Sequence, residues 1–170
     1  MLNSTSAGSL PYRDTKPVGA ADFYFAINAT FRFIRARLGE AGLRRYWTQL
    51  GTEYMAPVWK SWKAQGLPGI AAYWRDFFAA EPGAEVEVSH DERRVVLEVH
   101  VCPAIAHLRE HKREIMPGFC QHCYFVSEAA AQQAGYTVRV LGGNGSCRQE
   151  FYPAAANIEP QRLEEIAEAR

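Results

Sequence analysis

Apolar residues in the first part of the chain recur with the period of an α-helix. Between residues 20 and 38 they stand at intervals of four, four, three and four, as Phe23, Ile27, Phe31, Ile34 and Leu38. This spacing places them on one face and predicts an amphipathic helix. Gly39 follows the last of them and predicts the end of that helix.

Two further helical segments are expected before residue 84. The second has Leu43, Tyr46, Trp47, Leu50 and Tyr54 on its apolar side. Pro57 stops or kinks it, and a short piece continues to Gly66. The third opens at Pro68, a favoured residue for a first helical turn, and buries Ile70, Trp74, Phe77 and Phe78 before Pro82-Gly83.

The apolar period then changes from about 3.6 to 2, which is typical of strands with one buried face. Val86 and Val88 alternate with glutamates, and a second alternating run covers 94–101 with a turn at 90–92. These residues predict a β-hairpin. A second hairpin is expected from strands at 136–141 and 146–152, joined by Gly142-Gly143-Asn144-Gly145.

Helices are expected between and after the two hairpins. Pro103 suits the first turn of a helix to about residue 112, and a second helix is expected over 119–134, ended by Gly135. A closing helix is expected over 160–169. The chain therefore predicts an α+β fold of order ααα-ββ-αα-ββ-α, in which N-terminal helices pack on a mainly antiparallel four-stranded sheet.

The composition favours one domain and a small-molecule partner. The chain has 170 residues, is 48% hydrophobic, and balances 19 Lys and Arg against 19 Asp and Glu. It is long enough for one core at 19–170, and no charge excess favours nucleic acid or a membrane surface. Residues 1–18 are rich in Ser, Gly and Pro and are expected to form a flexible arm. Self-association as a homo-oligomer stays open.

The segment 102–151 holds all four cysteines and three of the five histidines. No apolar leader or membrane span is seen near the N-terminus, so a cytoplasmic location is expected, where cysteines stay reduced. Thiol chemistry or a metal site is then favoured over a disulfide framework. Burial of each cysteine as a small apolar side chain is the structural alternative.

The positions of the cysteines fit thiol chemistry better than a metal site. Cys102 precedes Pro103 at a helix start, where unpaired N–H groups favour the ionised thiol. Cys120 and Cys123 open the next helix, and Cys147 follows the Gly-rich turn, which can offer N–H donors. A structural zinc site built from all four would have one close Cys-x-x-Cys pair where two are usual. We expect no cofactor and no metal.

Two histidines stand at i and i+4 on a short charged helix, a spacing that can bring both imidazoles to one metal. They are His107 and His111. The charged neighbours of His111 favour a solvated face for that residue. His107 lies closer to apolar positions and is the candidate general base.

Three motifs resemble the L-2-amino-thiazoline-4-carboxylic acid hydrolase family. They are Cys-Pro-Ala-Ile-x-His at 102–107, the Cys120/Cys123 pair opening a helix, and Gly-Asn-Gly-Ser-Cys-x-x-x-Phe at 143–151. The resemblance covers roughly residues 20–155. Members of that family open the cyclic isothiourea ring of aminothiazoline carboxylate to give a carbamoyl-cysteine. The resemblance implies catalytic roles for Cys102, Cys123 and Cys147, and leaves Cys120 and His122 outside the matched positions.

Ring opening of a cyclic amidine or isothiourea needs a nucleophile, a proton shuttle and donors for the tetrahedral adduct. We expect an ionised Cys123 or Cys147 to attack, with His107 as proton shuttle. Residues around Asn144 and Ser146 would hold the adduct. An anionic substrate would pair with Arg139 or Arg148. The alternative is a non-catalytic sensor domain that binds a small ligand and holds a structural cysteine–zinc site.

Overall fold

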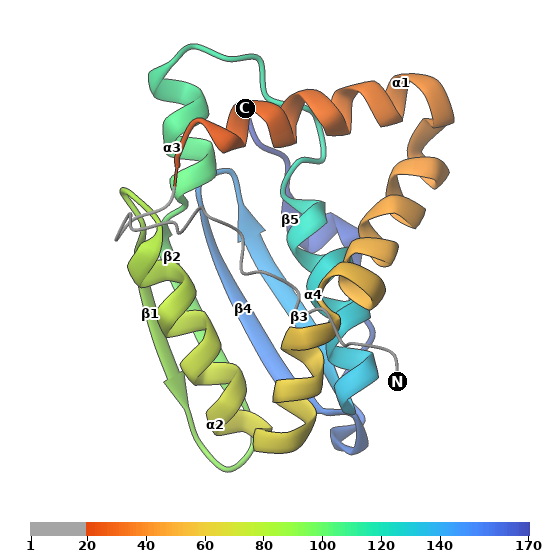
Figure 1. Ribbon diagram of the computed structural model, residues 1–170, viewed down its shortest axis with the longest axis vertical. Coiled ribbons are helices and arrows are strands. Elements are labelled where there is room, and N and C mark those ends of the chain that lie inside the picture. Colours follow the sequence, from red (N-terminus) through yellow and green to blue (C-terminus); the bar gives the residue numbers. More distant parts are fainter. Residues whose placement is uncertain (1–19) are drawn as a thin grey trace, which may run out of the picture.

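The computed structural model describes residues 20–170, so the predicted arm at 1–18 lies outside the described residues. The described chain forms a five-stranded, mostly antiparallel sheet with helices packed on it (Figure 1). The predicted α+β class is therefore confirmed. The predicted strand count of four is one too low.

The N-terminal helices are α1 (Phe23–Gln49), a π-helical turn η1 (Leu50–Tyr54) and α2 (Ala56–Ala80). Gly39 and Gly66 take left-handed φ values of 67° and 70° inside α1 and α2, and the chain changes direction at both (Figure 1). Only glycine adopts this backbone readily. The predicted helix breaks at these two residues are confirmed.

The first hairpin is β1 (Glu85–His90) with β2 (Val95–Val101), and the second is β3 (Tyr136–Gly143) with β4 (Ser146–Pro153). Both pair antiparallel, and β2 also pairs antiparallel with β4. The sheet order is β1-β2-β4-β3-β5. Strand β4 is therefore central in the sheet, with β2 on one side and β3 on the other.

The predicted closing helix at 160–169 is wrong. A 3₁₀ turn η3 (Leu163–Glu165) leads into β5 (Ile166–Ala167), which pairs parallel with Gly142 and Gly143 of β3. Gly143 has no Cβ and so lets the backbone of Ala167 come close. Pairing with the otherwise open edge of β3, together with burial of Ile166, outweighs the weak helical pattern of this segment.

Helices α3 (Pro103–Glu110) and α4 (Gln121–Ala134) connect the two hairpins, and a 3₁₀ turn η2 (Ala154–Ala156) follows β4. Gly135 ends α4 with φ 88°, as expected of a glycine cap. In the described chain, no helix combines the length and apolar character needed to cross a membrane.

Alternation along the strands gives the sheet one apolar face. On it, Val95 and Leu97 of β2, Val138 and Val140 of β3 and Phe151 of β4 are buried under Trp62, Ile70 and Trp74 of α2. In Figure 1, α2 and α4 lie over this face with β4 visible between them. A second apolar cluster joins α1, α3 and α4 through Phe31, Trp47, Ile105, Leu108 and Phe119.

Four residues of the predicted apolar stripes are exposed instead of buried. Their exposed fractions are 68% for Phe23, 61% for Leu38, 82% for Tyr54 and 39% for Phe77. Each stands near an end of its helical segment: at the first residue of α1, beside the break at Gly39, at the last residue of η1, and in the last turn of α2. Periodicity identifies a face but does not show how far the packing partner extends along it.

Candidate functional site

All four cysteines gather where the second hairpin turn meets the starts of α3 and α4. Cys102 immediately precedes α3, Cys120 and Cys123 lie at the start of α4, and Cys147 lies on β4. The backbone ties these elements together. The N–H of Cys102 donates to the carbonyl of Gly145 (2.8 Å), and the N–H of Asn144 donates to Sγ of Cys120 (3.4 Å).

The Gly-rich turn thus offers an N–H donor to a cysteine sulfur, whereas the sequence predicted donors for a substrate adduct. The acceptor is Cys120, which the sequence reasoning had left outside the candidate set. Cys120 also contacts both apolar clusters. The structure therefore joins Cys120 to the other three thiols.

Burial controls the protonation of these thiols. It raises the pKa of Cys102 and of Cys123 to about 11 and that of Cys120 to about 12. The pKa of Cys147 is raised as well, by burial and then by repulsion from a Cys123 thiolate. The N–H groups of Ala104 and Ile105 oppose the rise at Cys102 but are outweighed. The expectation that a helix start ionises a resting thiol is therefore corrected, because desolvation is the larger effect.

A buried imidazole lies directly against one of the thiols. Nε2 of His122 is 3.6 Å from Sγ of Cys123, and Nδ1 of His122 is 2.6 Å from the carbonyl oxygen of Phe119. A carbonyl only accepts, so Nδ1 carries the proton and Nε2 presents its lone pair to the thiol. Burial lowers the pKa of His122, which keeps the ring neutral.

The sequence reasoning missed His122 because consecutive helix residues point in different directions. The pair forms because both residues belong to the first turn of α4, where the His122 side chain bonds back to the carbonyl three residues earlier. The rings of Phe31 and Phe119 hold the imidazole, with centroids 5.3 Å and 4.8 Å away. The sequence feature that could have identified this pair is a His adjacent to a Cys at a predicted helix start.

His107 is brought to the start of α1. Its Nε2 lies 3.0 Å from Oδ1 of Asp22, and its ring stacks on Phe25 with centroids 4.8 Å apart. The ring of His111 is 4.3 Å away. The contacts of His107 in the described chain are therefore with α1 and with its own helix.

Two polar side chains that were not predicted from the sequence, Tyr24 and Gln149, border the thiols. The hydroxyl of Tyr24 donates to the carboxylate of Glu81. Burial, Glu81 and the neighbouring Cys102 and Cys123 all raise the pKa of Tyr24. Gln149 is 4% exposed, with its Nε2 3.8 Å from Sγ of Cys147 and no partner for Oε1 among the described residues. An unpaired buried carbonyl is costly, so this oxygen is available to a ligand donor.

The side chains of the predicted substrate-binding residues are engaged with groups other than the thiols, while the backbone N–H of Asn144 donates to Sγ of Cys120. Oδ1 of Asn144 accepts from Arg109 and from the N–H of Arg170 (2.9 Å), so it fixes the C-terminal segment. Ser146 is exposed and, by alternation along β4, lies on the face opposite Cys147.

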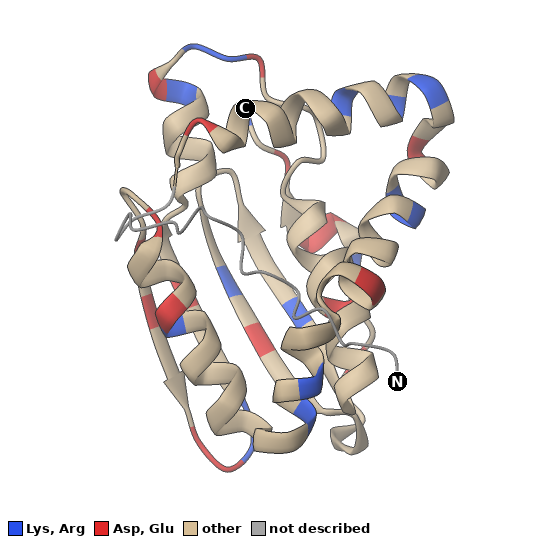
Figure 2. Ribbon diagram, viewed as in Figure 1, with Lys and Arg blue, Asp and Glu red and all other residues tan. Residues whose placement is uncertain are grey.

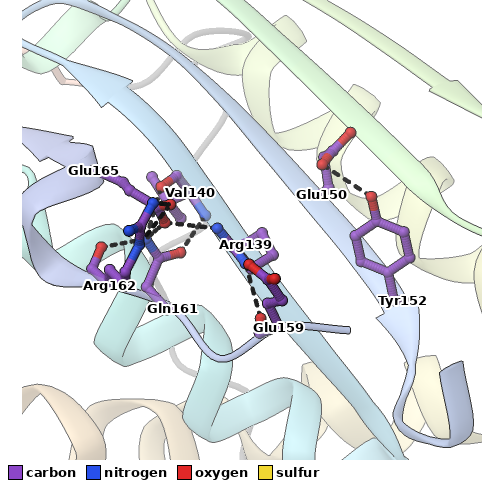
Figure 3. Close-up of polar contacts among 8 residues, drawn as sticks. All are labelled: Arg139, Val140, Glu150, Tyr152, Glu159, Gln161, Arg162 and Glu165. Carbon is purple, nitrogen blue, oxygen red and sulfur yellow. Dashed lines mark hydrogen bonds and ion pairs between the residues drawn. The ribbon is translucent and has the colours of Figure 1, made fainter. Parts of the chain in front are cut away.

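Arg139 and Arg148 also lie on that opposite face, where they stand across from Glu150 and Glu98 on the neighbouring strands. Figure 2 marks charged positions along β3 and β4. Arg139 contacts Glu165 (2.6 Å) and the Glu159 carbonyl (2.8 Å), as drawn in Figure 3. Arg148 pairs with Glu98 and with Glu150 (2.9 Å). Both guanidiniums are therefore held by partners on the face away from the thiols.

The thiols do not form a compact metal-ligand set. In the chain from residue 20 onward, the one group of three candidate side chains whose ligand atoms all lie within 4.8 Å of one another is His107, Glu110 and His111. A tetrahedral thiolate site with Zn–S bonds of about 2.3 Å needs its sulfurs closer together than the four cysteines are.

Comparisons of the chain with known protein families, with curated proteins and with solved structures find no match.

Proposed function

We propose that the protein is a hydrolase that opens the ring of a small cyclic amidine or isothiourea, with Cys123 as nucleophile and His122 as base. An aminothiazoline carboxylate is the substrate that the family resemblance suggests. The observation that carries the proposal is the contact of 3.6 Å between Sγ of Cys123 and the unprotonated Nε2 of His122. A thiol next to an oriented base is the arrangement of an activated nucleophile.

The resting pair is neutral, so the thiol proton moves to Nε2 of His122 as Sγ attacks the amidine carbon. The ring bond from that carbon to its heteroatom breaks, and the proton on Nε2 passes to the leaving atom. Water then adds to the sulfur-linked carbon, and the C–S bond to Cys123 breaks, which restores the thiol. The net change is addition of one water, with no oxidant or reductant.

Other groups around the thiols suit this substrate class. The unpaired Oε1 of Gln149 can accept an N–H from an amidine, which carries donors on each nitrogen. The Tyr24–Glu81 pair supplies a carboxylate near the thiols that complements a protonated amidinium. Cys102 and Cys147 are the second-choice nucleophiles, because no imidazole contact accompanies them among the described residues.

The convergence of four cysteines also supports the alternative function, a ligand-binding domain with a structural zinc. Binding of a metal would draw the sulfurs together and deprotonate them. In that case no bond of the ligand would break, and loss of any one cysteine would release the metal.

The test is turnover of 2-aminothiazoline-4-carboxylate and of a simple cyclic amidine, followed by chromatography of the ring-opened product. Cys123→Ser and His122→Asn are expected to lose most activity, on the order of 10²-fold or more, while staying folded. Intact-protein mass spectrometry of the wild type during turnover should show a covalent adduct that Cys123→Ser lacks.

Cys120→Ser is the matched control, because Cys120 lies on the same helix start without an imidazole contact. It should retain turnover. Equal loss of activity in all four Cys→Ser variants, accompanied by early melting and zinc release, would favour the ligand-binding alternative. Absence of turnover in the wild type with every cyclic amidine and isothiourea tried would remove the hydrolase proposal.

A further inference from the structure

Three potential metal ligands lie together on the exposed side of α3. None of them has a role in the proposed reaction. His107, Glu110 and His111 form the sequence His-x-x-Glu-His, so one helical turn presents two imidazoles and a carboxylate. One ligand atom from each lies within 4.8 Å of the other two. That spacing allows a single ion to contact all three after small side-chain rotations.

One nitrogen of each imidazole already has a hydrogen-bond partner in the protein. Nδ1 of His111 lies 3.0 Å from the carbonyl oxygen of His107, so this nitrogen carries the proton and Nε2 keeps the lone pair. Nε2 of His107 lies 3.0 Å from Oδ1 of Asp22. An ionised carboxylate only accepts, so Nε2 donates there and Nδ1 of His107 keeps its lone pair. Metal-binding histidines show this pattern, in which the other ring nitrogen donates to a carboxylate or carbonyl.

Packing also restricts the two rings before any ion arrives. Phe25 of α1 stacks on His107 and meets the edge of His111 at 5.2 Å between centroids. The side chain of His107 is 16% exposed, while Glu110 and His111 are exposed to solvent. An ion would therefore be held against α3 and stay open to water on its outer side.

The charged groups near this cluster are of both signs. The guanidinium of Arg113 lies over the ring of Phe25, which also contacts both histidines, with its Cζ 4.6 Å from the ring centroid. Arg109 is turned to the C-terminal segment, where it donates to the Arg170 carbonyl (2.9 Å). Asp22 and Glu110 supply the negative charge that offsets a divalent cation.

We propose that His107, Glu110 and His111 form a binding site for one divalent transition-metal ion of the imidazole-preferring kind, with Zn²⁺ as the representative. Asp22 acts as the partner that orients His107. Three protein ligands leave a coordination position for water or for a small anionic ligand. The ion also links α3 to the start of α1 through the His107–Asp22 contact. The site stands on its own and does not depend on the thiol chemistry proposed above.

The test uses the untagged full chain with its thiols kept reduced. Isothermal titration with Zn²⁺ should show a site that His111→Asn abolishes and that Asp22→Asn weakens by about 10-fold. Glu110→Gln should weaken it as well. His100→Asn is the matched control, because His100 is an exposed histidine that pairs with Glu87 on the sheet. It should bind as the wild type does.

Co²⁺ separates this site from the cysteines. A Co²⁺ ion held by imidazole and carboxylate gives visible d–d bands without a thiolate-to-metal charge-transfer band. These d–d bands should persist in Cys123→Ser. The proposal is overturned if His111→Asn binds Zn²⁺ as tightly as His100→Asn. It is equally overturned if all bound Co²⁺ shows the thiolate band and is lost with the cysteines.

Discussion

Nε2 of His122 lies 3.6 Å from Sγ of Cys123, its neighbour in the chain, inside the first turn of α4. The contact places a neutral imidazole and a neutral thiol together in a buried setting, because burial moves the two pKa values in opposite directions. The resting protein therefore stores neither a thiolate nor an imidazolium at this position. Charge appears only when a proton passes between them.

Acid should destabilise the protein through His122. Its pKa is lowered in the folded state from the ordinary value of 6.5, so the unfolded chain binds more protons as the pH falls below about 6.5. The stabilising contribution is full above that pH and is lost as the pH falls toward the folded-state pKa. Urea unfolding at a series of pH values from 7 to 5, all about one half unit apart, should show this slope.

The variant for that experiment is His122→Phe, which keeps an aromatic ring in the cluster with Phe31 and Phe119. It should flatten the acid slope and cost about 1–3 kcal/mol at neutral pH, because the Phe119 carbonyl loses its side-chain donor. His90→Gln, an exposed histidine, should leave the slope unchanged. An identical slope in His122→Phe would show that other groups cause the acid sensitivity.

Alkylation of Cys123 by iodoacetamide should be slow in the native protein at neutral pH. Since burial raises the thiol pKa to about 11, the rate should rise only as the pH approaches that value. A free thiol titrates near 8.5. Mass spectrometry of digested samples gives the rate at Cys123 separately from the other cysteines. A rate profile centred at or below 8.5 would show that the thiol is ionised more easily than its burial predicts.

Gly143→Ala should detach β5 from the sheet. An added Cβ would meet the backbone of Ala167, and Gly143 has a φ of 146° that disfavours other residues. We expect a loss of about 1–3 kcal/mol in unfolding free energy and faster amide exchange at Ile166 and Ala167. Gly83→Ala is the control, because Gly83 has a positive φ with nothing within 4 Å of an added Cβ. Equal losses of unfolding free energy in both variants would show that backbone strain alone causes the effect and that contact with Ala167 does not contribute.

Arg148→Met should leave ligand turnover unchanged, because Arg148 lies on the face of the sheet opposite the thiols. Stability should fall by less than about 1 kcal/mol, since the Arg148 and Glu98 side chains are partly exposed and Glu150 keeps Arg94 and Tyr152 as partners. Steady-state kinetics and thermal melting check both statements. A large rise in KM with unchanged melting would return Arg148 to the substrate site.

The sequence alone determined the order of most elements. Helical and strand periods, with glycines at 39, 66 and 135, located three helix breaks or ends that the structure has. These signals are local, since a glycine with positive φ or a change of period acts within one or two turns. Alternation along β3 and β4 is equally local, and it places Arg139 and Arg148 on the face of their strands away from the core.

Only the tertiary structure decided which groups meet. The last segment became β5 because the edge of β3 lay open beside Gly143, a fact that no pattern within 160–169 contains. His107 went to Asp22 and Phe25 of α1, and His122 went to Cys123, because packing of α1 against α3 and α4 fixes both rings. The protonation of the thiols was also decided there. Desolvation depends on everything that surrounds a group, whereas a helix start or a Gly-rich turn describes only its neighbours in sequence.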